Sequence, residues 1–339
     1  MNFAVNDVSA SRTRSRRHGR LRPRLPPANV PPRSPIPAAI DLTGKTVLVT
    51  GSNSGLGLEC ARHFLALRAS FLVMAVRSLA KGEAAAEGLR AEFPDARIEV
   101  WELDMASFRS VRAFAERCKR ELMFKRVEEG RCRETTLQVN YLATALLAIL
   151  LLPIMKPSST KGPGSEPGRL TLISSDAALT APLSDPGERN SILDSLDRTE
   201  TFDGYAQYGV SKLLLTMFVA KLATGHFVSA DDVIVNVSNP GPTKGTELIS
   251  KGPLSTRLFT GVLFGVLGRS AADAARTYVH SSLVLGRESH GGYTEWVVRA
   301  WPPMMYTEEG HRLGDRLWDE TMEELSFAKV EELLEELKR

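Results

Sequence analysis

The chain of 339 residues contains only three cysteines, Cys60, Cys118 and Cys132. Three is too few, and an odd number, for a disulfide framework, and no pair has the spacing of a zinc site. The six histidines are scattered and show no metal-binding spacing either. We therefore expect reduced thiols, as in intracellular proteins, and no metal site.

Long hydrophobic runs are also missing. The runs Leu142–Met155 and Leu258–Leu267 have 14 and 10 residues, whereas a membrane-spanning helix needs roughly 18–20. We interpret the first as a buried helix and expect no transmembrane span. The second is either a lid helix or a shallow membrane contact, and lid packing is favoured. No apolar core follows the basic start of the chain, so we expect no secretory signal.

Positive charge is concentrated in residues 1–40, which hold eight arginines, seven prolines and one acidic residue, Asp7. Because this segment lacks apolar periodicity, we expect a disordered basic arm. Three interpretations stay open: a solvated tail, a mitochondrial presequence whose helix the prolines would disrupt, and an arm for nucleic acid or membrane surfaces. We expect a cytoplasmic protein, with mitochondrial targeting as the alternative. The rest of the chain has a slight excess of acidic residues and predicts no nucleic-acid partner.

From Asp41 onward, segments with strand and helix patterns alternate. Continuous apolar strands between helices predict a parallel sheet covered on both faces. The fold class is therefore α/β, with one doubly wound Rossmann-type domain over residues 41–325 and a C-terminal helix over 326–339. The expected strands are 45–50, 71–76, 97–103, 169–174, 232–238 and 293–298, and the expected helices include 58–69, 106–122, 205–224 and 270–284.

A glycine-rich turn, TGSNSGLG (50–57), follows the first strand and opens the first helix. Gly51 permits the tight turn, Gly55 lets the backbone approach a pyrophosphate, and Gly57 allows close packing of helix on strand. The N–H groups of the helix N-terminus can bind the phosphates. The turn predicts a dinucleotide site to which Ser52, Asn53 and Leu56 also contribute, although glycine turns without a ligand are common.

The end of the second strand bears on the choice of cofactor. Sites that prefer NAD place an acidic residue there to accept the ribose 2′-OH. This chain instead has Arg77, followed by Lys81. An arginine can bind a 2′-phosphate through two parallel hydrogen bonds, so the sequence favours NADP (NADPH) over NAD. The alternative is a surface arginine that merely follows a strand.

Tyr208 and Lys212 lie four residues apart in YGVSK and share one face of a helix. This spacing also arises by chance, so the pair depends on its neighbours in the sequence. Ser175 ends a strand upstream, and Asn140 lies in an earlier helix. Pro240 and Gly241 end the next strand and are followed by Thr243 and Thr246.

These residues resemble the pattern of the short-chain dehydrogenase/reductase superfamily. The matching pieces are TGSNSGLG, Asp104 in ELDM, Asn140, Ser175, Tyr208 with Lys212, and Pro240-Gly241, in the order of the family. The resemblance covers about residues 41–325. Phrases such as DLTGKTVLVTGSNSGLG, RSLAKGEAA and QVNYLATALLAILLLP look like the fungal branch related to retinol dehydrogenases, many of whose members tailor polyketides or terpenoids.

The resemblance implies a role for each matching residue. Tyr208 would be the general acid in reduction and the general base in oxidation, and Lys212 would lower its pKa. Ser175 would hydrogen-bond the carbonyl oxygen, and Asn140 would keep a water in line with Lys212. In the cofactor site, Asp104 would hold the adenine amino group, and Thr243 or Thr246 would contact the carboxamide. The resemblance also allows a homodimer.

One part of the family pattern is missing. The family has a fourth strand ending in an Asn-Asn-Ala-Gly-like turn, which lies between strands one and five in the order 3-2-1-4-5-6-7. Here the 13 residues from Met123 to Thr135 contain seven charged side chains, too many for a buried strand. About fifteen residues are therefore missing, and a coding segment dropped after Leu122 would explain the loss. We expect a sheet with its fourth strand degraded or absent and closed imperfectly there.

Three functions remain open from the sequence. The first is an NADP-dependent oxidoreductase that interconverts a ketone and a secondary alcohol on an apolar metabolite, as a tailoring step in fungal secondary metabolism. The second is a catalytically impaired nucleotide-binding relative with a scaffold or regulatory role. The third is an interaction protein whose basic arm binds nucleic acid or anionic lipid. For the first, the polar stretch between Ser175 and Tyr208 and the apolar residues from Thr246 to Gly268 predict a pocket for a bulky, small-molecule substrate.

Overall fold

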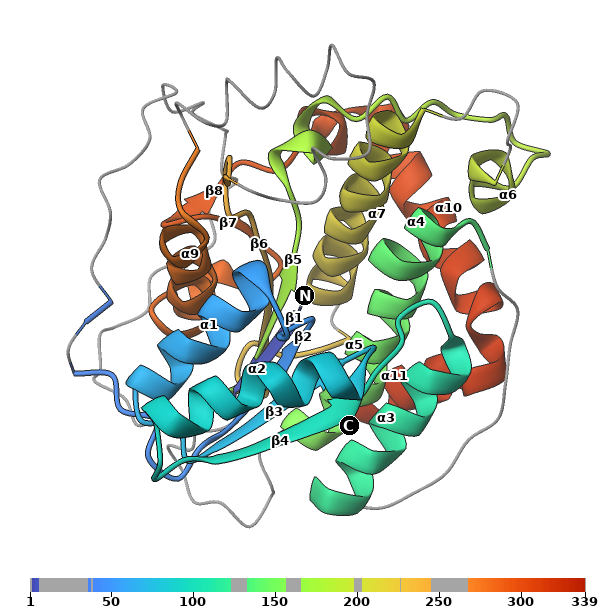
Figure 1. Ribbon diagram of the computed structural model, residues 1–339. Helices are drawn as coiled ribbons and strands as arrows, with labels where there is room; N and C mark the ends of the chain where they lie inside the picture. Colours follow the sequence, from blue (N-terminus) through green and yellow to red (C-terminus); the bar gives the residue numbers. More distant parts are fainter. Residues whose placement is uncertain are drawn as a thin grey trace.

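The computed structural model describes residues 2–5, 36–37, 39–122, 133–156, 166–197, 203–225, 227–244 and 268–338. Its centre is an eight-stranded sheet in the order β4-β3-β2-β1-β5-β6-β7-β8 (Figure 1). The strands are β1 (Asn2–Val5), β2 (Thr46–Thr50), β3 (Phe71–Val76), β4 (Arg97–Glu102), β5 (Gly168–Ile173), β6 (Val233–Ser238), β7 (Tyr293–Thr294) and β8 (Val298–Arg299). Strands β2 to β4 are parallel to one another, as are β5 to β7.

Helices cover both faces of the sheet, as the continuous apolar strands predicted (Figure 1). The helices are α1 (Gly55–Ala66), α2 (Leu79–Glu92), α3 (Phe108–Leu122), α4 (Thr135–Leu137), α5 (Ala143–Met155), α6 (Ile192–Leu196), α7 (Gly204–Thr224), α9 (Ala271–Leu283), α10 (Glu308–Glu324) and α11 (Val330–Leu337), with the π-helical turn η1 (Gln138–Leu142) and the 3₁₀ turn η2 (Asp176–Thr180). One core cluster packs α1, α2 and α9 against the sheet, and the other packs α3, α5, α7, α10 and α11 against it. Neighbouring residues of β2 divide between them: Val47 and Val49 join the first cluster, and Leu48 joins the second.

The apolar run at 142–155 is a core helix of this fold. The continuous helical segment Thr135–Met155 is long and apolar enough to cross a membrane, but 78% of its most apolar window is buried inside the protein. It packs on β5 and on α3, α7 and α11. Its burial follows from its composition, because it has no polar face to turn toward solvent. The region 258–267 lies outside the described residues.

The position of the expected fourth strand, between β2 and β5, is filled (Figure 1). Strand β1 pairs antiparallel with β2, where Phe3 faces Val49, and antiparallel with β5, where Phe3 faces Thr171. The expectation that residues 1–40 are entirely disordered is therefore wrong for residues 2–5, and so is the expectation of an imperfectly closed sheet. The physical reason is that the facing edges of β2 and β5 carry N–H and C=O groups that need partners. The uncharged segment NFAV supplies these partners, and an antiparallel strand can do so as well as a parallel one.

Two other expectations change at the ends of elements. The strand expected at 293–298 pairs with β6 only at Tyr293 and Thr294, after which the chain turns back into the antiparallel strand β8. The C-terminal segment is divided, because Lys329 adopts a left-handed conformation (φ 53°) before α11. From α3 the described chain resumes at Arg133, directly before α4. Met123 to Cys132 are outside the described residues.

Candidate functional site

The glycine-rich turn lies between β2 and α1, at the carboxyl edge of the sheet. Gly51 (φ 64°) and Gly55 (φ 54°) are in the left-handed region, and a Cβ atom at either position would meet no atom within 4 Å. The N-cap residue of α1, Ser54, makes no side-chain cap, so the first-turn N–H groups are not satisfied by it. The buried Ser52 hydroxyl has no hydrogen-bond partner among the described residues. This combination of open backbone and unsatisfied donors fits a dinucleotide pyrophosphate.

Two further predicted cofactor residues lie at the same edge, after β3 and β4. Arg77 is exposed directly after β3, and it makes no hydrogen bond or ion pair with the described residues, so its guanidinium is available to a ligand. Lys81 is exposed in the first turn of α2. Asp104 follows β4, and one of its carboxylate oxygens accepts a hydrogen bond from the Ala106 N–H at 3.0 Å. A cofactor adenine at Asp104 would therefore meet a carboxylate whose orientation is already fixed.

Tyr208, Lys212 and Ser175 come together where α7 crosses the end of β5. The Lys212 ammonium donates to the Ile173 carbonyl at 2.8 Å and lies 5.7 Å from the centre of the Tyr208 ring. The Ser175 side chain lies close enough to the Tyr208 hydroxyl to lower its pKa. The Ser175 hydroxyl also accepts from the Ala177 N–H at 3.3 Å, as the cap of η2. The structure thus brings together three of the four predicted catalytic residues by direct contact or close approach.

Asn140 lies in the π-helical turn η1, which faces α7. Its amide donates to the Ser211 hydroxyl at 3.1 Å, and that hydroxyl donates to the Tyr208 carbonyl at 2.8 Å. A π-turn widens the helix by one residue and is frequent at functional sites. Here it lies between α4 and α5 and turns Asn140 toward the helix that carries Tyr208 and Lys212. All four predicted catalytic residues therefore belong to one connected site.

Burial sets the titration of the two central groups. It lowers the pKa of Lys212 to about 8 from 10.5. Burial also raises the pKa of Tyr208, and the hydrogen bond with Ser175 offsets only part of that rise. The pKa of Tyr208 is therefore raised overall in the protein without ligands, and the lowering effect expected of Lys212 stays a prediction. The reason is that desolvation disfavours the phenolate and the ammonium alike.

The loop after β6 forms the third side of the site. Gly241 (φ 70°) adopts a left-handed conformation that its neighbours could not share at low cost, and its N–H donates to the Asn239 side chain at 3.1 Å. The buried Thr243 donates to the Gly241 carbonyl at 3.0 Å, which leaves that hydroxyl's acceptor capacity for a ligand. The Pro240 carbonyl accepts a hydrogen bond from the Arg269 guanidinium at 3.0 Å. Thr246 lies outside the described residues.

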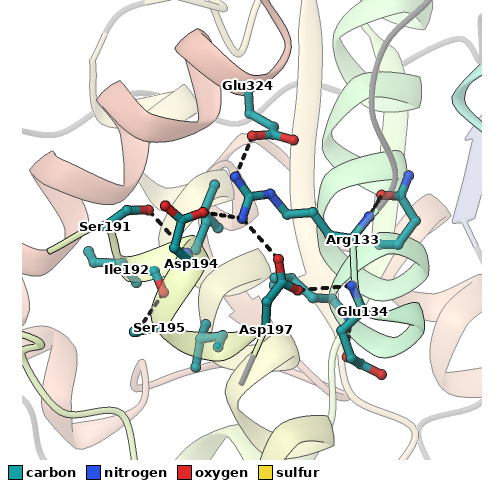
Figure 2. Close-up of polar contacts among 12 residues, drawn as sticks. Arg133, Glu134, Ser191, Ile192, Asp194, Ser195, Asp197 and Glu324 are labelled. Carbon is teal, nitrogen blue, oxygen red and sulfur yellow. Dashed lines mark hydrogen bonds and ion pairs between the residues drawn. The ribbon is translucent and has the colours of Figure 1, made fainter. Parts of the chain in front are cut away.

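Arg133 was not recognised from the sequence, where it is one of seven charges in a polar stretch. Its guanidinium contacts Asp194 at 2.6 Å, Asp197 at 3.0 Å and Glu324 at 2.6 Å (Figure 2). The neighbouring Glu134 caps α4 and accepts from Gln207, the residue before Tyr208, at 3.3 Å. These contacts join α6, in the segment between Ser175 and Tyr208, to α4 and α10. No sequence signal marks Arg133, because its partners are 61 to 191 residues away.

No group of three or more His, Cys, Asp or Glu residues that could hold a metal ion occurs in the described part of the chain. Cys60 and Cys118 are buried free thiols, and Cys132 lies outside that part. The donor set at the carboxyl edge consists of backbone N–H groups, hydroxyls and cations. Such donors suit phosphates and a carbonyl group.

Comparison with known proteins agrees with this geometry. The sequence profile described as short chain dehydrogenase matches residues 45–184. The chain is 41% identical to the short chain dehydrogenase/reductase mfmJ of Annulohypoxylon moriforme over 335 residues, covering 94% of this chain and 92% of that protein. It is 42% identical to the short chain dehydrogenase virL of Hypocrea virens, covering 90% and 92%. Its fold is similar to that of L-sorbose reductase from Gluconobacter frateurii, solved with NADPH and L-sorbose, with a TM-score of 0.54 and 20% identity over 76% of this chain and 98% of that one.

The chain belongs to the short-chain dehydrogenase/reductase superfamily, in its fungal branch related to secondary metabolism. It is an oxidoreductase with a nicotinamide cofactor. The residues that would hold this cofactor are the glycine turn, Arg77, Asp104, Tyr208, Lys212 and the loop at Pro240–Thr243.

Proposed function

We propose that this protein is an NADPH-dependent reductase that interconverts a ketone and a secondary alcohol on an apolar metabolite of fungal secondary metabolism. The observation that carries the proposal is the connected set Ser175–Tyr208–Lys212–Asn140, which lies at the carboxyl edge of the sheet beside the open glycine turn. Tyr208 as proton donor, Ser175 as hydrogen-bond donor to the oxyanion and Lys212 as cation therefore lie next to the expected dinucleotide site.

The side chains divide the work of carbonyl reduction. The nicotinamide supplies the hydride when it is bound. Ser175 donates a hydrogen bond to the carbonyl oxygen and orients it toward Tyr208. Tyr208, whose raised pKa keeps its proton at neutral pH, donates that proton to the developing alkoxide. Lys212 lies behind the tyrosine ring and stabilises the phenolate that remains.

Asn140 provides a path for the proton that Tyr208 must regain. Its amide is connected through the Ser211 hydroxyl to the Tyr208 backbone, which fixes its position relative to Lys212. A water held between the Asn140 side chain and the Lys212 ammonium would connect the site to solvent. The pKa of Lys212, about 8, is close enough to neutral for the ammonium to exchange this proton readily.

Three observations support the finer parts of the proposal. Arg77 is an exposed cation without a hydrogen-bond or ion-pair partner among the described residues, at the end of the strand where a 2′-phosphate would lie. The structural relative from Gluconobacter frateurii was solved with NADPH. For the substrate, Tyr205 presents an exposed aromatic ring one turn before Tyr208, which suits an apolar molecule. A cytoplasmic location and a homodimer remain predictions of the sequence.

The second candidate is a nucleotide-binding relative with impaired catalysis. Strand β1 favours it, because an antiparallel segment from the start of the chain stands where a parallel strand and its turn toward the adenine ribose were expected. Purified protein titrated with NADPH, NADP⁺ and NADH by fluorescence, then assayed with the bicyclic ketone 2-decalone, separates the candidates. NADPH binding with turnover supports the reductase, binding without turnover of a ketone panel supports the impaired relative, and no binding of any dinucleotide contradicts both.

A further inference from the structure

Four charged residues of alternating sign, Arg269, Glu295, Arg299 and Asp176, form a charge network next to the site. Arg269 donates to one oxygen of Glu295 at 2.7 Å, and Arg299 donates to the other oxygen at 2.9 Å. Arg299 also donates to Asp176 at 3.2 Å. Single ion pairs are common on protein surfaces, but here one carboxylate bridges two guanidinium groups whose far ends reach different loops of the site.

At one end of this charge network, Arg269 holds the loop after β6. Arg269 donates to the Pro240 carbonyl at 3.0 Å. Gly241 lies directly over the ion pair, because a Cβ atom on it would be 3.0 Å from the Arg269 guanidinium and 3.4 Å from the Glu295 carboxylate. The backbone of this loop, which lies where the nicotinamide would bind, therefore rests on the Arg269–Glu295 pair.

At the other end of the charge network, Asp176 belongs to the turn that Ser175 caps. Asp176 is the first residue of η2, which Ser175 caps, and its carboxylate accepts from Arg299 at 3.2 Å and from the Tyr293 hydroxyl at 3.4 Å. A shift of Asp176 would move the hydroxyl of the residue before it. The position of Ser175 is therefore coupled to Arg299.

Glu295 is the central residue of the charge network, because it bridges both arginines. Its side chain is 9% exposed and that of Arg269 is 14% exposed, so their charges are poorly solvated. Without the carboxylate, the Arg269 and Arg299 guanidinium groups would face each other in a largely buried space, with the Arg299 side chain 29% exposed. Like charges repel more there than in bulk water, since solvent screens them less. Both arginines would have to move, and each would carry its loop with it.

We propose that Glu295 is a positioning residue that sets the distance between the nicotinamide loop at Pro240-Gly241 and the carbonyl-binding Ser175. It touches neither substrate nor cofactor, and it acts through Arg269 on one side and Arg299 on the other. The inference rests on the proposed reductase function. Misplacement of reacting groups by even 1 Å can cost a reaction roughly a hundredfold in rate. The network therefore contributes to hydride transfer more than to substrate binding.

The test compares Glu295→Gln, which keeps the shape and removes the charge, with Glu166→Gln. Glu166 forms a similarly buried ion pair with Arg169, at 3.9 Å and with both side chains 13% exposed, at the opposite end of β5. We expect Glu295→Gln to slow single-turnover hydride transfer from saturating NADPH to 2-decalone by roughly tenfold or more. The primary deuterium isotope effect with 4,4-dideuterated NADPH should rise. For Glu166→Gln, the rate of hydride transfer and the isotope effect should both stay within twofold of those of the unmodified protein.

A second readout does not need turnover. Affinity for NADPH should fall in Glu295→Gln, while affinity for adenosine 2′,5′-bisphosphate, which lacks the nicotinamide half, should stay within twofold. If the unmodified protein binds neither ligand, the proposed function fails. If it binds both and Glu295→Gln changes neither their ratio nor the isotope effect, or behaves as Glu166→Gln does, the positioning role is overturned. Should Glu295→Gln not fold, Arg299→Met removes the connection between Glu295 and Asp176, leaves the Arg269–Glu295 pair in place, and must itself slow hydride transfer.

Discussion

The Lys212 ammonium donates a hydrogen bond of 2.8 Å to the carbonyl oxygen of Ile173, the last residue of β5. This contact holds the lysine beneath Tyr208, and the side chain is almost completely buried. Burial disfavours its charge and lowers its pKa to about 8. The cation to which we assign a catalytic role is thus kept at a cost to the stability of the fold.

The first prediction concerns this cost. The pKa of Lys212 is 10.5 in the unfolded chain and about 8 in the folded protein. Between these values the unfolded state binds more protons, so the contribution of this group to stability rises with pH. Below pH 8 the charge must be buried, and a shift of this size corresponds to about 3 kcal/mol. Lys212→Met should therefore abolish turnover and raise the free energy of unfolding at pH 7.

Denaturant unfolding at pH 7 and pH 9.5 checks this prediction. The stabilisation of Lys212→Met relative to the unmodified protein should be largest at pH 7 and should shrink toward pH 9.5. Lys221→Met, on the exposed face of the same helix, is the control and should show no such pH dependence. A Lys212→Met variant that is less stable than the unmodified protein at pH 7 would show that burial is not the dominant effect.

Arg77 gives the second prediction. Arg77→Asp would remove the proposed partner of the 2′-phosphate and add repulsion against it. The ratio of kcat/KM for NADPH to that for NADH should fall, and the loss should lie mainly in the affinity for NADPH. Lys45, away from the carboxyl edge at the start of β2, offers a control substitution to aspartate with the same change in charge. An unmoved ratio, or an unmodified protein that already prefers NADH, would contradict the assignment.

The third prediction concerns β1. Ala4 lies in the middle of this strand, opposite Leu48 of β2 and Leu170 of β5. Ala4→Pro removes a ladder N–H and should lower the free energy of unfolding by about 1–3 kcal/mol. Ala4→Gly keeps the N–H and should cost less than Ala4→Pro. Equal stability of Ala4→Pro and the unmodified protein would mean that residues 2–5 do not complete the sheet in solution.

Arg133 gives the fourth prediction. Arg133→Met leaves Asp194, Asp197 and Glu324 facing one another without their shared cation. Loss of one partner from a buried ion network costs about 3–5 kcal/mol, and exposure of Asp194 places the expected value at the lower end. Because α6 then keeps its hydrogen bonds to Glu320 of α10 but loses the Arg133 contact, KM for 2-decalone should rise more than kcat falls. Arg287→Met, in an exposed pair with Asp231, is the control. Identical KM values for both variants would argue against a role for α6 in substrate binding.

The sequence predicted the elements that depend on local patterns. Short apolar runs predicted the buried strands β2, β3 and β6, and helical spacing predicted the helices α1, α3 and α7. The strand ends in turn placed Arg77, Ser175 and Pro240. Strand β1 could not be predicted in this way. Its four residues have no periodicity of their own within an arginine-rich segment, and their pairing with β2 and β5 depends on contacts far away in the chain.

Long-range charge contacts were also beyond a reading of the sequence. Arg133 contacts Glu324, 191 positions away, and Arg299 contacts Asp176, 123 positions away. In the sequence these residues look like ordinary solvated charges, because nothing local shows which of them the fold will bury together. The overall rise in the pKa of Tyr208 could not be predicted for a similar reason, because the burial of Tyr208 depends on the packing of α7 against η1 and η2.

The most direct test of the central claim is the rate of hydride transfer from NADPH in Tyr208→Phe. The ring and its packing stay, and only the proton donor is lost. We predict a fall in turnover of 2-decalone by roughly 10²–10⁴-fold, with NADPH affinity within twofold of the unmodified protein. Turnover at the rate of the unmodified protein would contradict the assignment of Tyr208 as the general acid.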